Sequence, residues 1–453
     1  MPSAIPSEHA VHSVHSVWTS DEGSMAQVTA ATRWPKIVQD MIEDVGETAR
    51  LSHEPEVKAE SLAIQIALKD MKNEIQQNKP LRPLRSDGRP DIGKYNNEIE
   101  RAGKWTWLSS PWLFSECYLY RRVQTVLSTS HHWKNYDVFK RQKDSTFAKS
   151  RVAVEELASR YIQIFEGLES SSNDSSEELQ KLLFIEMTEI ALWGNATDLS
   201  LLSHLSLEDL QNLQGREAIA KSQRNIIDND TDDVYSYFKS GTYARDRRVD
   251  IVLDNAGFEF FTDVLYAAYL LDAGFASSIT FHAKDFPWFV SDVVQNDVQA
   301  LFEHLISPQL FPNRQFLDEL VLRLENMFDS GAVTVKSHPF WTTACSFHEM
   351  PQEAPDLFQE LKDSFLVVFK GDLNYRKLTK DGLWPYTTPF REAIGPLGKS
   401  GMPVLALRTN KSDTCVGVES QQVVERLDIE APGGAWVRNG KYAVVSFCDG
   451  RLS

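Results

Sequence analysis

The sequence predicts a three-layer α/β/α fold with a mainly parallel, Rossmann-like sheet, preceded by an all-α domain. Three observations support this fold class. Short β-branched or apolar runs recur after residue 248, and helical segments separate most of them, which is the pattern of right-handed βαβ units. Before that point the apolar residues recur only with helical spacing. The first run, 249–253, stops abruptly at Asp254, Asn255 and Gly257, where a strand is expected to feed a helix.

The first half of the chain is expected to be all-helical. Residues 1–30 are rich in Ser, Ala, His and Val without a sustained period, so we expect a disordered tail. Residues 31–240 are expected to form the α-helical domain, with apolar stripes that predict helices near 37–45, 56–75, 154–165 and 179–192. The proline-rich stretch 80–95 predicts a loop, and the acidic stretch 206–240 is expected to connect helices. The aromatic-rich stretch 105–120 is interpreted as core.

Residues 241–453 are expected to form the α/β catalytic domain. The run 249–253 suits a strand buried on both faces. Gly257 allows a tight turn after it, and residues 258–271 carry apolar side chains at helical spacing. Further strands are expected at 278–281, 332–335, 365–369, 404–407 and 442–447.

Polar side chains follow four of the expected strands. In a parallel sheet these groups would meet at the carboxyl edge, where ligands bind in open α/β folds. Carboxylates and an amide suit a divalent cation, and lysine and arginine suit a phosphate, so the layout indicates metal-assisted phosphoryl transfer. The groups, in chain order, are Asp254, Asn255 and Glu259; Lys284, Ser291 and Asp292; Lys370 to Lys377; and Arg408 to Lys411.

Each group also has a simpler interpretation. Asp254 and Asn255 are equally suited to cap the following helix, and a lone K-G-D or R-T-x-K stretch is commonly a turn with surface charge. The sequence contains no G-x-x-x-x-G-K-[ST] and no G-x-G-x-x-G after a strand, which excludes a P-loop and an ordinary dinucleotide site. The missing glycine-rich turn also weakens an ordinary methyltransferase interpretation.

Several stretches resemble the damage-control phosphatases, in particular the branch marked by an R-T-x-K motif. They include SPWLFSECYLYRR (110–122), IVLDNAGFEFFTD (251–263), FKGDLNYRKLT (369–379) and LRTNK (407–411). The resemblance extends from about residue 35 to the C-terminus. It implies hydrolysis of small sugar phosphates, fructose 1-phosphate and fructose 6-phosphate among them. It also implies a divalent metal cofactor, Mn²⁺, Co²⁺ or Ni²⁺ rather than Mg²⁺.

The motif matches place the metal on Asp254, Asn255 and Asp292. They place substrate contacts on Asp254, Asn255, the segment Asp372–Arg376 and Lys411. The other charged groups expected at the carboxyl edge of the sheet are added to these. The expected catalytic residues are Asp254, Asp372 and Lys411. The expected substrate-binding residues are Asp254, Asn255, Glu259, Lys370, Asp372, Leu373, Asn374, Tyr375, Arg376, Arg408 and Lys411.

Two other functions stay open at this point. A methyltransferase activity toward protein glutamate side chains is also associated with this branch, and its S-adenosylmethionine contacts would fall on Glu259 and Asp292. The other alternative is a non-catalytic binder of sugar phosphates.

The charge balance narrows the range of partners. The 453 residues carry a net charge of −17, which argues against general binding to nucleic acid or to an anionic membrane. No long uncharged apolar run occurs, so no transmembrane helix is expected. The four cysteines are far apart and form no C-x-x-C, which favours a reducing compartment. We expect the cytoplasm, with the nucleus as an additional location. The sequence indicates no particular oligomeric state.

Overall fold

A computed structural model of the chain describes residues 14–170, 177–194, 223–240 and 246–451. Its centre is a seven-stranded sheet with the order β1-β7-β6-β5-β2-β3-β4. Every neighbouring pair is parallel except β6 and β7, which are antiparallel. The mainly parallel α/β prediction is therefore confirmed. The strands are β1 (Ile226–Asn229), β2 (Arg248–Val252), β3 (Ser278–Ala283), β4 (Val333–Ser337), β5 (Leu366–Lys370), β6 (Val404–Thr409) and β7 (Ala443–Cys448).

The register of the central strands places the candidate residues together. Strand β5 reads Leu-Val-Val-Phe-Lys and is buried along its whole length, as expected for a strand covered on both faces. Val252 at the end of β2 pairs with Phe369 of β5. Because the two strands are parallel and end at the same level, the segment after Leu253 and the segment after Lys370 emerge side by side at one edge of the sheet.

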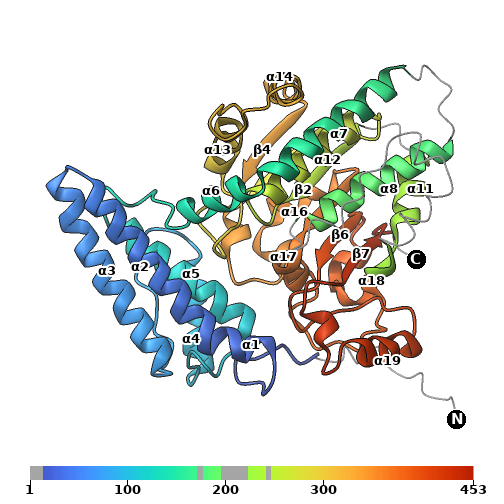
Figure 1. Cartoon of the computed structure of the whole chain (residues 1–453). Coiled ribbons are helices and arrows are strands. Elements are labelled where there is room, and N and C mark those ends of the chain that lie inside the picture. Colours follow the sequence, from blue (N-terminus) through green and yellow to red (C-terminus); the bar gives the residue numbers. More distant parts are fainter. Residues whose placement is uncertain (1–13, 171–176, 195–222, 241–245, 452–453) are drawn as a thin grey trace, which may run out of the picture.

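Helices cover both faces of this sheet (Figure 1). One face buries Ile251, Val368 and Leu405 in a cluster with the helices α7, α8, α12 and α14. The other face buries Val252, Val367 and Val404 with helices of the C-terminal third. The helices of this three-layer unit are α6 (Lys140–Lys149), α7 (Arg151–Ser170), α8 (Glu177–Trp193), α11 (Thr231–Lys239), α12 (Phe258–Asp272), α13 (Gln295–Leu305), α14 (Leu317–Asp329), α15 (Met350–Glu353), α16 (Pro355–Lys362), α17 (Gly371–Leu378), α18 (Phe390–Ala393) and α19 (Gln421–Glu430).

A separate layer of helices stands beside the sheet, drawn in blue and cyan in Figure 1. It has its own buried cluster, which includes Trp34, Trp107 and Tyr118. Phe286, Trp288 and Leu373 of the α/β half join this cluster, so the two halves share a packed interface. The layer contains α1 (Met25–Val28), the π-helical turn η1 (Thr29–Arg33), α2 (Trp34–Leu51), α3 (Pro55–Gln76), α4 (Ile92–Ala102) and α5 (Trp112–Ser128).

The all-helical interpretation of residues 31–240 is corrected at its C-terminal end. Residues 226–229 form β1, which pairs with β7 at the edge of the sheet. The element was missed because it has only four residues, Ile-Ile-Asp-Asn. Helices α7 and α8 pack on α12 beneath the sheet rather than with α2 to α5. Residues 195–222 and 241–245 lie outside the described part of the chain.

The expected disordered tail is also corrected over the residues that the structure describes. Val17 is buried and its backbone N–H donates to Asp381 at 2.9 Å. The carbonyl of Val17 accepts from Trp112 at 2.9 Å. These partners are remote in sequence, so no local period announces them. Residues 1–13 lie outside the described range, and none of the described helices is long and apolar enough to span a bilayer.

Candidate functional site

The loop after β2 presents two acids and an amide. Asn255 Nδ2 donates to Asp254 Oδ2 at 2.7 Å and to Glu259 Oε2 at 2.8 Å. Gly257 takes a positive φ of 77° and is the N-cap of α12, with no side chain capping the helix. The helix-cap interpretation of Asp254 and Asn255 is therefore wrong. Their side chains bond to each other and to Glu259 at the sheet edge.

Asp292 joins this group from the segment after β3. The backbones of Asn255 and Asp292 form an antiparallel bridge, and the N–H of Val293 donates to the Asp254 carbonyl at 2.8 Å. Lys284 Nζ lies 3.2 Å from Asp292 Oδ2 and donates to the Leu253 carbonyl at 2.6 Å. Lys284 therefore links the Asp292 carboxylate to the backbone at the end of β2.

The turn that delivers Asp292 is strained. Phe289 and Val290 have φ values of 42° and 70°, a region that β-branched and bulky residues rarely adopt. Both residues line the cavity described below. Strain of this kind is concentrated at functional sites, where the surrounding structure enforces it. Here it accompanies the hydrogen bond from Ser291 Oγ to Asn255 Oδ1.

Burial sets the electrostatics of the acids. It raises the pKa of Asp254 well above its ordinary value, and the charges of Glu259 and Asp292 raise it further. Burial likewise raises the pKa of Asp292 to about 6, against the opposing charge of Lys284. Two buried acids that repel each other are costly when ionised. A bound cation would favour their ionised forms.

The donor set fits a divalent cation. Asp254, Asn255 and Asp292 offer hard oxygen atoms. No three His, Cys, Asp or Glu side chains in the described segments group as a metal site; this donor set consists of two carboxylates and the amide of Asn255, all at the surface of one cavity. The residues present therefore fit the metal that the sequence implied.

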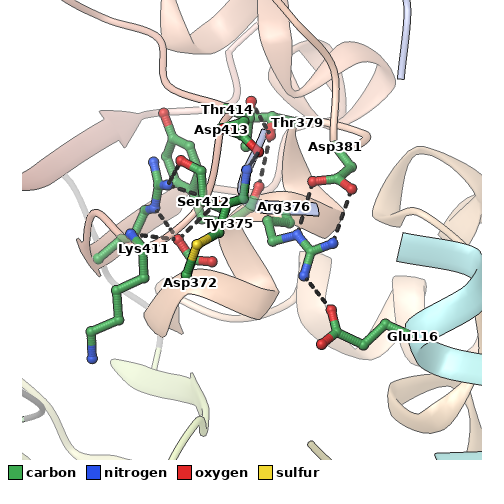
Figure 2. Close-up of polar contacts among 12 residues, drawn as sticks. Glu116, Asp372, Tyr375, Arg376, Thr379, Asp381, Lys411, Ser412, Asp413 and Thr414 are labelled. Carbon is green, nitrogen blue, oxygen red and sulfur yellow. Dashed lines mark hydrogen bonds and ion pairs between the residues drawn. The ribbon is translucent and has the colours of Figure 1, made fainter. Parts of the chain in front are cut away.

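The segment after β5 contributes the second part of the site. Gly371, with φ 81°, lies so close to Asp254 that a Cβ there would be 1.8 Å from Oδ2. Asp372 Oδ1 accepts from Arg408 Nε at 2.8 Å, from the Lys411 N–H at 3.2 Å and from Ser412 Oγ at 3.0 Å. Figure 2 shows the Lys411 side chain extending away from this cluster.

A cavity of about 380 Å³ opens above the acids. Seven of the sequence-predicted residues line it, and the helical layer supplies much of the rest of its wall. The predicted residues at its surface are Asp254, Asn255, Asp292, Asp372, Leu373, Arg376 and Lys411, and the others include Met25, Arg33, Ile37, Asp40, Trp112, Glu116, Tyr120, Phe139, Gln142, Phe289, Val290 and Ser291.

Arg376 is held by two carboxylates at this surface. Its guanidinium bonds to Asp381 at 2.8 and 3.0 Å and to Glu116 at 2.9 Å (Figure 2). It also lies over the ring of Trp112, 3.7 Å from its centroid. These contacts fix Arg376 in place and use most of its hydrogen-bonding capacity.

Five predicted substrate-binding residues do not line the cavity: Glu259, Lys370, Asn374, Tyr375 and Arg408. Asn374 donates to the carbonyls of Val252, Leu253 and Lys370, and Tyr375 accepts from Val416 at 3.1 Å. These side chains are buried and bond within the protein, and the direct substrate contacts expected of them stay a prediction.

Lys370 and Arg408 also lie behind the cavity wall, where each forms an ion pair with an acid of the protein. Lys370 Nζ lies 2.6 Å from Asp263 and 3.5 Å from Glu259, and these acids raise its pKa against the effect of burial. Arg408 is fully buried, bonds to Asp372, and stacks 4.3 Å from the ring centroid of Tyr375. Both cations support acids whose positions define the site.

The helical layer is the part of the wall that sequence reasoning missed. Trp112 and Tyr120 line the cavity, although the aromatic stretch that contains them was interpreted only as core. Arg33 of this layer and Gln142 of α6 also line it, and no motif marks either residue. The one usable signal was the stretch 110–122, which carried the family resemblance without indicating which side chains face the site.

The fold and the site together define an α/β protein with an acidic centre, made of carboxylate and amide side chains, at the carboxyl edge of its sheet. A family model described as the damage-control phosphatase ARMT1-like domain matches residues 29–427. The chain therefore belongs to the damage-control phosphatase family, which confirms the resemblance found in the sequence.

Several proteins named damage-control phosphatase ARMT1 are similar to this chain over nearly its whole length. Damage-control phosphatase ARMT1 of Xenopus laevis is 36% identical over 448 residues, which cover 95% of this chain and 98% of the relative. The Homo sapiens protein of the same name is 34% identical with the same coverage. The Danio rerio protein is 34% identical over 442 residues, covering 94% of this chain and 95% of the relative. A DUF89 family protein from Pyrococcus horikoshii, known from a crystal structure, is 12% identical with a TM-score of 0.38, covering 92% of this chain and 96% of that chain.

Proposed function

We propose that this protein is a metal-dependent phosphatase that hydrolyses small sugar phosphates, with fructose 1-phosphate and fructose 6-phosphate as its first candidates. The observation that carries the proposal is the convergence of Asp254, Asn255 and Asp292 at the base of a cavity that Lys411 also lines. Family membership supports phosphate-ester hydrolysis. We choose sugar phosphates as the substrates because the R-T-x-K stretch, which ends at Lys411, resembles the motif of the branch that acts on them.

Asp254, Asn255 and Asp292 would hold a divalent metal, with Mn²⁺, Co²⁺ or Ni²⁺ preferred over Mg²⁺. A metal bound there supplies Lewis-acid polarisation of the phosphoryl group and lowers the pKa of a bound water. The structural support is the buried pair Asp254 and Asp292 at the surface of one cavity, where burial raises the pKa of both carboxyls.

Lys411 is proposed to neutralise the phosphate as charge develops on it. Its charge acts on Asp254, whose pKa it lowers against the larger effects of burial and acidic neighbours. Asp372 accepts from the backbone N–H of Lys411 and from Arg408, so it fixes the loop that carries the lysine. Asp372 also lines the cavity, where we assign it proton transfer or orientation of a sugar hydroxyl.

The test is phosphate release from fructose 1-phosphate by metal-stripped protein, with Mn²⁺, Co²⁺, Ni²⁺ and Mg²⁺ added back singly. Asp254→Asn keeps the size of the side chain and removes its charge, and Asp363→Ala, on the exposed end of α16, is the matched control. We expect metal-dependent release in the wild type and the control, and none above background in Asp254→Asn. Absence of release with every metal, from folded protein, contradicts the proposal.

Direct attack by water is proposed over attack by Asp254. Asp254 Oδ2 accepts from Asn255 at 2.7 Å and packs against Gly371, which restrains that oxygen. A single turnover in ¹⁸O-labelled water tests the assignment. Label found only in the released phosphate supports water attack, whereas label in the Asp254 carboxylate establishes an aspartyl-phosphate. Methyl transfer that continues in the presence of chelator would instead favour the methyltransferase alternative.

A further inference from the structure

The cavity has a second wall, which the helical layer provides. Helices α1, α2 and α5, the turn η1 and the start of α6 place side chains at its surface. Arg33 is the only cation among them. The helical layer contributes Met25, Arg33, Ile37, Asp40, Trp112, Glu116 and Tyr120, and the start of α6 contributes Phe139 and Gln142.

The cavity surface is negatively charged, so binding of a phosphate there requires a positively charged side chain that can bond to it. Five carboxylates and three cations line it: Asp40, Glu116, Asp254, Asp292 and Asp372 against Arg33, Arg376 and Lys411. An incoming phosphate dianion therefore meets a negative surface. A bound divalent metal offsets the excess of two carboxylates, but the phosphate still needs a hydrogen-bond donor whose charge is not already used.

Arg33 is such a donor. Arg376 is committed to Asp381 and Glu116. The Arg33 side chain is exposed, and within the described part of the chain it makes no hydrogen bond or ion pair. A guanidinium at a cavity surface without a carboxylate partner is suited to bidentate binding of a phosphate.

The backbone at Arg33 is fixed relative to the site. Arg33 ends the π-helical turn η1, and π turns inside helices are frequent at functional sites. The next residue, Trp34, is fully buried and its Nε1 donates to Glu116 Oε1 at 3.3 Å. The other oxygen of Glu116 accepts from Arg376 at 2.9 Å. One buried carboxylate thus ties the start of α2 to α17.

We propose that Arg33 is a substrate-binding residue that contacts the phosphate group and shares its neutralisation with Lys411. The inference rests on the proposed phosphatase function and deepens it, because it assigns part of phosphate recognition to the helical half. Hydrogen bonds between a guanidinium and a phosphate are charge-assisted and stronger than bonds between neutral groups. We therefore expect loss of the guanidinium to weaken phosphate binding by about tenfold or more.

The experiment compares Arg33→Ala, Arg33→Lys and Arg50→Ala in the metal-loaded protein. Arg50 is the matched control because it lies on α2, the helix that Arg33 directly precedes, is exposed, and pairs with Glu47 away from the cavity. We measure KM and kcat for fructose 1-phosphate, the inhibition constant of inorganic phosphate, and direct binding of inorganic phosphate by calorimetry. The melting temperature of each variant verifies folding.

We expect Arg33→Ala to raise both KM and the phosphate inhibition constant about tenfold, with a smaller change in kcat. Arg33→Lys retains the charge but not the bidentate geometry, so it should recover part of the loss. Arg50→Ala should match the wild type. The difference between Arg33→Ala and wild type should shrink as salt is raised, because Arg33 is exposed.

The outcomes separate this inference from the proposed function. If the wild type is active and Arg33→Ala equals Arg50→Ala, the inference is wrong and the phosphatase proposal stands. If KM rises while phosphate inhibition and binding are unchanged, the phosphate contact is also refuted. If the wild type releases no phosphate but binds it more tightly than Arg33→Ala, the phosphatase proposal fails and the anion-binding role of Arg33 stands. If neither release nor binding occurs, both are overturned.

Discussion

Replacing Gly371 by alanine tests how closely the site depends on one backbone contact. Gly371 has φ 81°, and an added Cβ would lie 1.8 Å from Asp254 Oδ2 and 2.6 Å from Asp254 Cβ. Contacts below 3.0 Å do not occur, so one of the two groups must move by at least about 1.2 Å. Rotation of the Asp254 side chain can relieve the contact with Oδ2 but not the contact with Cβ. Because β2 and β5 are buried and hydrogen-bonded to each other, the substitution must displace both the Asp254 side chain and the backbone where these strands end.

The expected loss has two separable parts. A side chain at positive φ costs about 1–2 kcal/mol in stability. Displacement of a group in the reacting centre by about 1 Å costs on the order of a hundredfold in rate. Gly401 provides the matched control, because it has φ 85° and its nearest added contact would be at 3.9 Å. Gly401→Ala should therefore carry the strain without disturbing Asp254.

The assay is metal-dependent phosphate release, together with the rise in melting temperature on addition of Mn²⁺. We expect Gly371→Ala to lose about a hundredfold in kcat/KM and most of its Mn²⁺-induced stabilisation. Gly401→Ala should be destabilised but retain both. Equal activity and equal Mn²⁺ response in the two variants would refute the assignment of Asp254 to the metal site.

Three further predictions follow from the same contacts. Glu116→Gln weakens the acceptor that Arg376 and Trp34 share and should lower the free energy of unfolding by about 1.5–3 kcal/mol in denaturant titrations; unchanged stability would show that the pairing contributes little. Because burial raises the pKa of Asp292 to about 6 in the metal-free protein, the folded state holds a proton that the unfolded state releases near pH 4. The stability of metal-free protein should therefore fall as pH rises from about 4 to 6, and Asp292→Asn should flatten this part of the Tm profile, whereas an unchanged profile argues against the raised pKa. Lys411→Ala should reduce kcat/KM by about 10²–10³-fold, with the exposed Lys441→Ala as control, and equal kinetics of the two variants would remove Lys411 from the site.

The parts of the fold that sequence predicted well are those in which the local pattern and the tertiary environment agree. Strand β5 reads as a continuous apolar run because both of its faces are buried. Strand β1 has only four residues, ends in Asp-Asn, and pairs on one side alone. Its strand conformation depends on β7, more than 200 residues away, and local pattern carries no such information.

The candidate site likewise contains residues that could be placed from the sequence and residues that could not. Asp254, Asn255 and Asp292 could be grouped from sequence, since parallel strands bring their carboxyl ends to one edge. Asn374 and Tyr375 illustrate the limit of that reasoning. They occur in the same motif segment as Asp372, but α17 turns their side chains inward, where they bond to main-chain groups. The position of a residue in a motif predicts that it lies near the site. Whether its side chain reaches the cavity depends on the face of the helix on which it lies.

Glu116 shows why the two halves of the protein have to be considered as one site. Its carboxylate joins Trp34 of the helical layer to Arg376 of the α/β half, and all three residues are buried. A buried acid with two donors holds its partners in a fixed arrangement, because losing either donor leaves a costly unpaired group. The wall that carries Arg33 is therefore positioned by the same contact that positions Arg376. Changes at the helical interface should accordingly alter phosphate binding even where they touch no residue of the acidic centre.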